Sequence, residues 1–284
     1  MESRNFILTG SAAQYYWKGE GLCSVKTFRG GAAYYNTGKG NFRVDETSFL
    51  LLNDGSEYAI EIGQRKPVDS FCLFFDRSLL DESFYGIGRT DNYQLENIGH
   101  YQQTSELFER TYPLAFLENA MVPLISNHKV LGAEPLWLEQ SFLSVMEVLK
   151  ELQNNDRAAR ERLQALRAST REELYRRTLK AREYIHANSE RPLSLQEIGL
   201  AAHLSVNHLL RCFKQAFGMS PHVYLTKLKI ASAQNLLKTT AISVSAIAEA
   251  VGFISLGSFS LLFKQHCGKS PEAYRKSQLP GRFA

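Results

Sequence analysis

An internal duplication in the C-terminal third constrains the fold of this chain more than any other feature of its sequence. Three positions, Ile198, Ala201 and Leu204, recur 49 residues later as Ile247, Ala250 and Phe253. After one inserted residue the spacing becomes 50, and Ser205, Leu209, Phe213, Lys214, Gln215, Gly218, Ser220, Pro221 and Tyr224 recur as Ser255, Phe259, Phe263, Lys264, Gln265, Gly268, Ser270, Pro271 and Tyr274. A run of this length with one slip indicates two copies of one structural unit. The slip falls where a turn would accept an extra residue.

Each copy has the pattern of a helix, a tight turn and a second helix. In the first copy, Leu195–His203 forms the leading helix, and Ser205 is placed to cap the second helix. The second helix has an apolar face at four-residue spacing and an opposite face with Asn207, His208, Arg211 and Lys214. The second copy runs through Val244–Val251, a Gly-Phe turn and Ser255–Cys267.

The segment between the copies, Pro221–Lys238, reads as one helix of roughly 25 Å at 1.5 Å per residue. A helix-turn-helix inserts its second helix into the DNA major groove, and two such helices on one DNA face lie about one helical turn, roughly 34 Å, apart. A rigid linker of this length fits that placement. The predicted units span about residues 195–217 and 244–267.

The second copy carries a specific motif: GF and a short polar stretch, then F-x-x-x-FK-x-x-x-G-x-SP-x-x-Y, and the first copy shares the part from FK onward. The stretches LSLQEIGLAAHLSVNHLLRCFKQAFGMSPHVYL and VSAIAEAVGFISLGSFSLLFKQHCGKSPEAYR resemble the DNA-binding domain of the AraC/XylS family of bacterial transcription regulators. The resemblance covers about residues 175–276 strongly and the rest weakly. It implies an N-terminal cupin-like domain, dimerising helices, contact with RNA polymerase and, most often, activation of transcription.

The resemblance also implies base contacts from the N-terminal part of each second helix. The predicted DNA-binding residues are Ser205, Asn207, His208, Leu210, Arg211 and Lys214 in the first copy, and Ser255, Leu256, Gly257, Ser258, Leu261 and Lys264 in the second. Many family members have an Arg where this sequence has Leu261, and Leu256 and Gly257 bond poorly to base edges. The first unit is therefore expected to read bases directly, and the second to contact phosphates or thymine methyl groups, or to read shape.

Net charge separates the two parts of the chain. Residues 171–284 hold 16 Lys and Arg against 7 Asp and Glu, a net charge of +9, whereas residues 1–170 hold 17 against 22 and carry −5. A basic segment behind an acidic one indicates a polyanionic partner, here double-stranded DNA, for the C-terminal part only. The sequence therefore predicts two domains, 1–170 and 171–284.

The segment from residue 20 to 80 has the pattern of a small β-domain. Short apolar runs alternate with turn signals, and Asn53-Asp54-Gly55 between two such runs indicates a hairpin. The predicted strands are Leu22–Phe28, Ala32–Tyr35, Phe42–Val44, Phe49–Leu52, Tyr58–Ile62 and Phe71–Phe75. Many short strands at close spacing favour a small barrel or jelly roll. The overall expectation is an α+β chain, with a cupin-like barrel and dimerisation helices before an all-α domain that carries two helix-turn-helix units and a linker helix.

A small organic effector is the expected ligand of this barrel. Candidate lining residues, taken from the strand alternation, are Lys26, Tyr34, Phe42, Arg43 and Tyr58, although a one-residue error of register would exchange them for their neighbours. Basic candidates suit an anion. No His precedes His100, so a metal site is not expected there. The sequence contains no GxSxG, HExxH or P-loop motif and no GxGxxG after a predicted strand. Neither catalysis nor a cofactor is therefore predicted. The alternatives are control by a partner protein, with a barrel filled by its own side chains, and a cupin-type enzyme.

From about residue 100 the pattern turns helical. Leu138, Phe142, Val145, Leu149 and Leu152 follow 4-3-4-3 spacing, which favours either a homodimer seam or packing on the β-domain. The four cysteines, Cys23, Cys72, Cys212 and Cys267, are widely spaced, as expected for reduced thiols. With no membrane span and no signal segment in the pattern, a cytoplasmic protein is expected.

Overall fold

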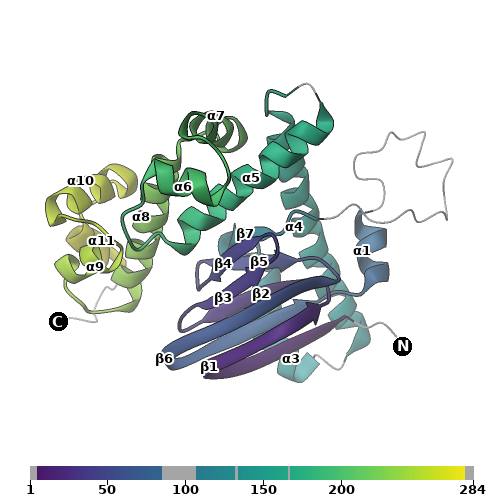
Figure 1. Cartoon of the computed structure of the whole chain (residues 1–284). Coiled ribbons are helices and arrows are strands. Elements are labelled where there is room, and N and C mark those ends of the chain that lie inside the picture. The colour runs from purple at the N-terminus through teal and green to yellow at the C-terminus, as the bar shows by residue number, and fades with distance from the viewer. Residues whose placement is uncertain (1–4, 85–106, 132–133, 166, 279–284) are drawn as a thin grey trace. The chain divides into compact units, whose positions relative to one another are not determined.

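The computed structural model describes residues 5–84, 107–131, 134–165 and 167–278. The chain divides into two compact units, Met1–Arg162 and Leu163–Ala284. The first is an antiparallel sheet curled into a nearly closed barrel with helices, and the second is all helix, which confirms the predicted α+β fold class (Figure 1). Within the described ranges, no helix combines the length and apolar character that a membrane crossing requires.

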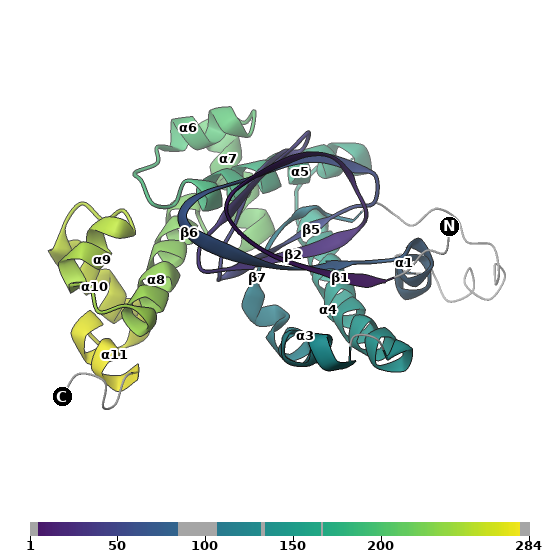
Figure 2. The same ribbon diagram turned by 90° about the horizontal axis from the view of Figure 1, so that it is seen from below.

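The seven strands of the barrel are all antiparallel to their neighbours. They are β1 (Phe6–Gly21), β2 (Ser24–Arg29), β3 (Ala33–Thr37), β4 (Gly40–Val44), β5 (Ser48–Leu52), β6 (Ser56–Phe74) and β7 (Arg110–Pro113). Their order is β4-β3-β6-β2-β5-β7, with β1 paired to β6. Seen from below, the strands form an almost complete ring (Figure 2).

Strand β6 organises the barrel because it is long enough to serve three partners. It pairs with β1 over nearly its whole length, with β3 through Tyr58–Glu61 and with β2 through Asp69–Phe74. The register with β1 shifts between Ala12 and Gln14, an irregularity that bends the pair. Strand β1 was not predicted. Its side chains are mostly exposed, so the residues before 20 carry no buried alternation to read.

The two faces of the sheet contribute side chains to two separate cores. On β2 and β5 the side chains alternate: Val25, Phe49 and Leu51 join a core with the helices, whereas Phe28, Leu50 and Leu52 fill the inside of the barrel. This is the period of two that a strand buried on both faces imposes. It also explains why these strands read as continuous apolar runs.

The helices of the N-terminal unit cover one face of the barrel (Figures 1 and 2). They are α1 (Arg77–Phe84), the 3-10 helix η1 (Leu114–Phe116), α3 (Glu118–Leu131) and α4 (Pro135–Glu161). Strand β7 interrupts the region that was predicted to be helical from about residue 100, and its paired stretch is only four residues long. The residues at which that region begins lie outside the described ranges.

The 4-3 seam of α4 faces its own barrel. Phe142, Val145 and Leu149 are fully buried in the core with β2, β5 and β6, and Leu152 is buried beside them, while Leu138 packs against the same cluster. Of the two alternatives for this seam, packing on the β-domain accounts for these contacts. Packing within one chain thus buries four of these five side chains, and the dimer contact predicted for them stays a prediction.

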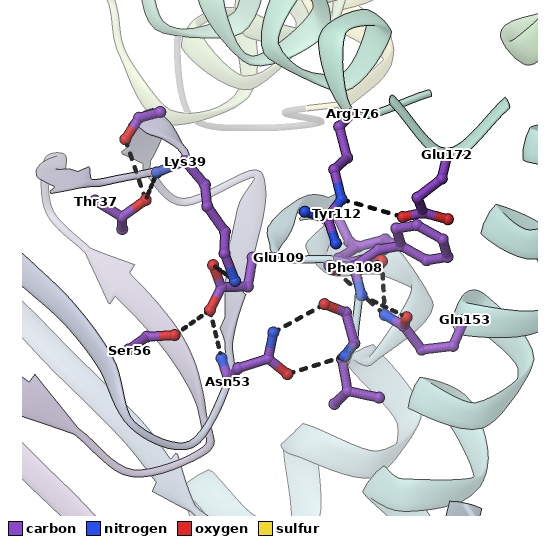
Figure 3. A network of polar contacts seen from close by, with 12 residues as sticks. Thr37, Lys39, Asn53, Ser56, Phe108, Glu109, Tyr112, Gln153, Glu172 and Arg176 are labelled. Atoms are coloured by element: carbon purple, nitrogen blue, oxygen red, sulfur yellow. Dashed lines mark hydrogen bonds and ion pairs between the residues drawn. The ribbon is translucent and has the colours of Figure 1, made fainter. Parts of the chain in front are cut away.

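A polar network fastens the segment that leads into β7 (Figure 3). The Glu109 carboxylate accepts hydrogen bonds from the Asn53 backbone N–H at 2.9 Å and from the Ser56 hydroxyl, and it pairs with Lys39 at 3.1 Å. Asn53 exchanges two further bonds with the backbone of Leu107. On the other side, the Phe108 N–H donates to Gln153 of α4 at 2.8 Å. The network thus joins the β5–β6 turn to α4 through one connecting segment.

The C-terminal unit consists of α5 (Ala168–Ala187), α6 (Leu195–Ala201), α7 (Val206–Phe217), α8 (Pro221–Thr239), α9 (Val244–Ala250), α10 (Leu256–Cys267) and α11 (Pro271–Gln278). Two helix pairs, α6–α7 and α9–α10, lie at the two ends of α8 (Figure 1). Each pair has its own core: Leu225 at the start of α8 packs with α5, α6 and α7, while Ile230, Ala233 and Leu237 pack with α9 and α10.

Candidate functional site

The turn has the same backbone geometry in both helix-turn-helix units. In the first, the Leu204 N–H donates to Gly199 O at 2.8 Å, and in the second the Phe253 N–H donates to Ala248 O at 2.9 Å. The residue before each donor has a positive φ, 54° at His203 and 77° at Gly252. The two donors, Leu204 and Phe253, are still 49 residues apart, whereas the next matching pair, Ser205 and Ser255, is 50 apart. The inserted residue of the second copy is therefore Ile254, which follows the turn and is 93% exposed.

Serine residues start the second helix of each unit. The Ser205 hydroxyl accepts a hydrogen bond from the His208 backbone N–H at 3.4 Å, and the Ser255 hydroxyl accepts one from the Ser258 N–H at 3.2 Å. Such caps satisfy backbone donors that have no partner within the helix. Both helices end at a left-handed glycine, Gly218 in one and Gly268 in the other. The sequence repeat thus encodes both ends of each helix.

Helix α7 separates an apolar face from a polar one. Leu209 and Phe213 are fully buried, and Phe213 contacts the rings of Phe217 and Tyr224 at 4.8 and 5.7 Å. The predicted DNA-binding side chains lie on the other side. Leu210 is half-buried, and the others are exposed: Ser205, Asn207, His208, Arg211 and Lys214. Two cationic side chains and several hydrogen-bonding groups therefore face away from the core along one helix.

Helix α10 presents a less polar surface. Phe259 and Phe263 are fully buried, while the six predicted DNA-binding residues Ser255, Leu256, Gly257, Ser258, Leu261 and Lys264 are all exposed. Leu256 is 47% and Leu261 61% exposed. The Ser255 hydroxyl also donates to Ser258 Oγ at 2.9 Å. Among these six residues, two leucines and a glycine thus stand beside two serines and one lysine.

Polar contacts brace both units against their surroundings. In the first, the Glu197 carboxylate accepts from Arg191 and from the Tyr184 hydroxyl, and these bonds hold the Glu197 pKa at about 2. In the second, Lys229 of α8 donates to the carbonyl of Gly252 at 2.6 Å. Burial lowers the pKa of Lys229. The sequence placed Gly252 in a turn, but it did not predict the roles of Tyr184, Arg191 and Lys229, because these roles depend on contacts between separate segments.

The barrel of the N-terminal unit contains a partly open cavity of about 510 Å³. Its walls come from β1, β2, β3 and β6, and they are mainly aromatic and aliphatic. The lining side chains include Trp17, Lys26, Phe28, Tyr35, Tyr58, Ile60, Ile62, Cys72 and Phe74. The volume lies within the range of small-molecule sites, roughly 300–1,000 Å³.

The structure divides the predicted effector residues into two groups. Lys26 and Tyr58 line the cavity, but Tyr34, Phe42 and Arg43 do not. Tyr34 pairs with Arg43 on the outer face of the β3–β4 hairpin, where Tyr34 is 43% exposed and Arg43 binds Asp45 at 2.8 Å. Phe42 is buried in the inner core without lining the cavity. The cavity residue of β3 is Tyr35, one position along the strand from Tyr34, which is the register error that a period of two allows.

Burial sets the ionisation of the groups around the cavity. Desolvation lowers the pKa of Lys26 to about 8 and raises that of Tyr58 to about 12. It also raises the pKa of Cys72 and, strongly, that of Tyr35. Within the described ranges, no three His, Cys, Asp or Glu side chains gather as a metal ion would require. The cavity thus offers an apolar wall with one lysine.

Comparison with known proteins matches this geometry at the C-terminal end. Residues 198–277 match the family model described as a helix-turn-helix domain. The HTH-type transcriptional regulator YisR of Bacillus subtilis is 24% identical over 87% of this chain and 83% of its own length. The HTH-type transcriptional regulator GbdR of Pseudomonas aeruginosa is 33% identical over 34% of this chain, and the chain spans only 27% of it.

A solved structure, the C-terminal domain of the response regulator AraT from Geobacillus stearothermophilus, is 31% identical with a TM-score of 0.36, and covers 38% of this chain and 90% of that domain. The family match spans α6 from Ile198 onward and the helices to α11, which are the elements of the sequence repeat and of the two capped helix pairs. The C-terminal unit of this chain therefore carries a helix-turn-helix domain, and it resembles the DNA-binding domains of AraC-type regulators.

Proposed function

We propose that this chain is a sequence-specific transcription regulator that reads DNA with α7 and α10 and is controlled by a small molecule bound in the barrel. The observation that carries the proposal is the matched construction of the two helix pairs. In both, a serine caps the second helix, apolar side chains that include phenylalanine bury one face, and polar residues of the first turn, Asn207 and His208 in α7 and Ser258 in α10, stay exposed. Exposed side chains at the N-terminal end of such a helix are those that reach base edges in the major groove.

The two units take different parts in recognition. Arg211, exposed on α7, suits bidentate bonds to guanine, and Asn207 one turn earlier suits adenine. On α10, Leu256 and Leu261 suit contact with thymine methyl groups, and Lys264 suits a phosphate. Lys214 has the same phosphate role on α7. Linker helix α8, with 19 residues, is about 28 Å long, close to the 34 Å between successive major grooves on one DNA face.

The cavity supports control by a small molecule. A barrel filled by its own side chains would favour control by a partner protein instead, whereas about 510 Å³ of apolar space with one lysine suits a ligand. Binding there would change DNA affinity or promoter activity through coupling between the two units, and this coupling is a measurable free energy.

The proposal also includes activation through contact with RNA polymerase, and a homodimer. Light scattering on the full chain with and without operator DNA measures its oligomeric state. A reporter gene placed behind the selected DNA site measures the sign of regulation.

The test begins with selection of binding sites by the full chain from a random DNA pool, followed by salt titration of the best site. The expected site has two elements about one helical turn apart, and its affinity falls steeply with salt because cations on both units release counterions from phosphates. Arg211→Ala should relax one base position in the first element. A chain that selects no site, and shows no salt-sensitive binding, would overturn the proposal.

A further inference from the structure

Lys26 is a buried cation that points into the barrel. It is 2% exposed, and across the sheet it is paired with Leu50 of β5 and Cys72 of β6. Its Nζ atom lies 3.7 Å from the ring centroid of Phe74 and 5.6 Å from that of Tyr58. The ammonium group thus lies against aromatic rings in the wall of the cavity.

No carboxylate neutralises this ammonium group among the described residues. It has neither a hydrogen bond nor an ion pair there, and its other contacts are electrostatic, with Cys72 and Cys23. The remaining titratable residues that line the cavity are Tyr15, Tyr35, Tyr58 and Glu20. Glu20 carries the only carboxylate among them, and it is exposed. An ammonium group has three donors, and burying it without acceptors is costly. Such a group is therefore prepared for an anion that enters with the ligand.

On the basis of the proposed function, we infer that the effector is an amphipathic organic anion, a carboxylate with an apolar body. The carboxylate pairs with Lys26 Nζ, and the body lies against the aromatic and aliphatic walls formed by Phe28, Tyr58, Ile60 and Phe74. A single cation favours a single negative charge. A strongly polar ligand such as a sugar would need more fixed donors and acceptors than these walls provide.

This assignment has a consequence for pH. Free Lys26 loses its proton near pH 8, whereas a bound carboxylate would hold the proton in place, so binding takes up a proton above that pH. Affinity for a carboxylate should fall about tenfold between pH 7 and pH 9. The pKa of Tyr35, Tyr58 and Cys72 is raised by burial, so these groups stay neutral over most of this interval.

The experiment compares carboxylates with their uncharged amides on the full chain by calorimetry. The probes are 2-naphthoate with 2-naphthamide, and decanoate with decanamide, because each pair has one apolar body and two different head groups. The wild type should bind at least one carboxylate ten or more times tighter than its amide. Lys26→Met should reduce that ratio to about one while the amide still binds. Lys18→Met, which removes an exposed lysine of β1, should leave the ratio unchanged.

Equal affinity for carboxylate and amide in the wild type, a ratio that survives in Lys26→Met, or no binding of any of the four probes would each overturn the assignment. The melting temperature of Lys26→Met shows whether the variant is folded. Site selection on DNA with the same preparations separates the two proposals: a chain that selects a site but does not prefer carboxylates remains a regulator with another effector. A chain that prefers carboxylates but selects no site loses the proposed function only.

Discussion

The carbonyl oxygen of Gly252 accepts a hydrogen bond from Lys229 Nζ at 2.6 Å, which ties the turn of the second helix-turn-helix unit to the linker helix. The same glycine has φ of 77°, and a Cβ atom there would lie 2.3 Å from the carbonyl oxygen of Glu190. The turn therefore has a backbone conformation and a neighbour that both exclude a side chain.

Gly252→Ala should destabilise the second unit by about 3 kcal/mol or more, because a left-handed alanine and an overpacked contact add up. The matched control is Gly218→Ala, which has φ of 71° but no atom within 4 Å of the added Cβ, and should cost only about 1–2 kcal/mol. Urea unfolding followed by circular dichroism measures both. Equal losses for the two variants would show that the contact with Glu190 contributes nothing.

Arg211→Ala should lower affinity for the selected site by about 1–3 kcal/mol, roughly five- to 150-fold, and relax one base position. Lys214→Ala and Lys264→Ala should weaken binding to all sequences alike and reduce the salt slope by roughly 0.9 each. Fluorescence anisotropy on the selected site and its single-base variants gives both quantities. If Arg211→Ala keeps specificity and Ser258→Ala abolishes it, the roles of the two units are reversed.

Leu261→Ala should weaken binding about fourfold if its exposed side chain packs on a thymine methyl group. Replacing that thymine by uracil in the DNA should cause the same loss with the wild-type protein. The two changes together should cost no more than one of them, because both remove the same contact. Additive losses would place the leucine and the methyl group in different contacts.

Lys26→Met should stabilise the N-terminal unit at pH 7. The folded pKa of Lys26 is about 8, below its ordinary 10.5, so between these values the unfolded chain binds more protons and the wild type gains stability as pH rises. The difference in unfolding free energy between Lys26→Met and the wild type should therefore shrink from pH 8 to pH 10.5, by up to about 3 kcal/mol. Thermal melts across this range measure it, with Lys18→Met as the flat control. A constant difference would mean that the lysine is not desolvated.

Local sequence signals predicted the C-terminal unit well and the inside of the barrel only in part. Serine caps, terminal glycines and four-residue apolar spacing act within one helix, so the sequence alone places α7 and α10. A strand differs, because its side chains change face at every residue. Lys26 and Tyr58 were identified as cavity residues, whereas on β3 the choice fell on Tyr34 instead of Tyr35.

The seam of α4 shows a second limit. The spacing of Phe142, Val145 and Leu149 specifies an apolar helix face, but the surface that covers this face is a property of the tertiary structure. A core within one chain and a seam between two chains bury the same side chains in the same periodicity. No pattern within the helix could distinguish them.

Helix α8 packs against α7 and α10 through two separate cores, because Leu225 belongs to one core, and Ile230, Ala233 and Leu237 belong to the other. Substitutions in distant sites that share no partner act additively. Under the proposed function, each half of the DNA site would therefore change its preferred sequence in evolution without disturbing the other. Recombination that exchanges one helix pair at α8 would yield regulators with new combinations of half-sites.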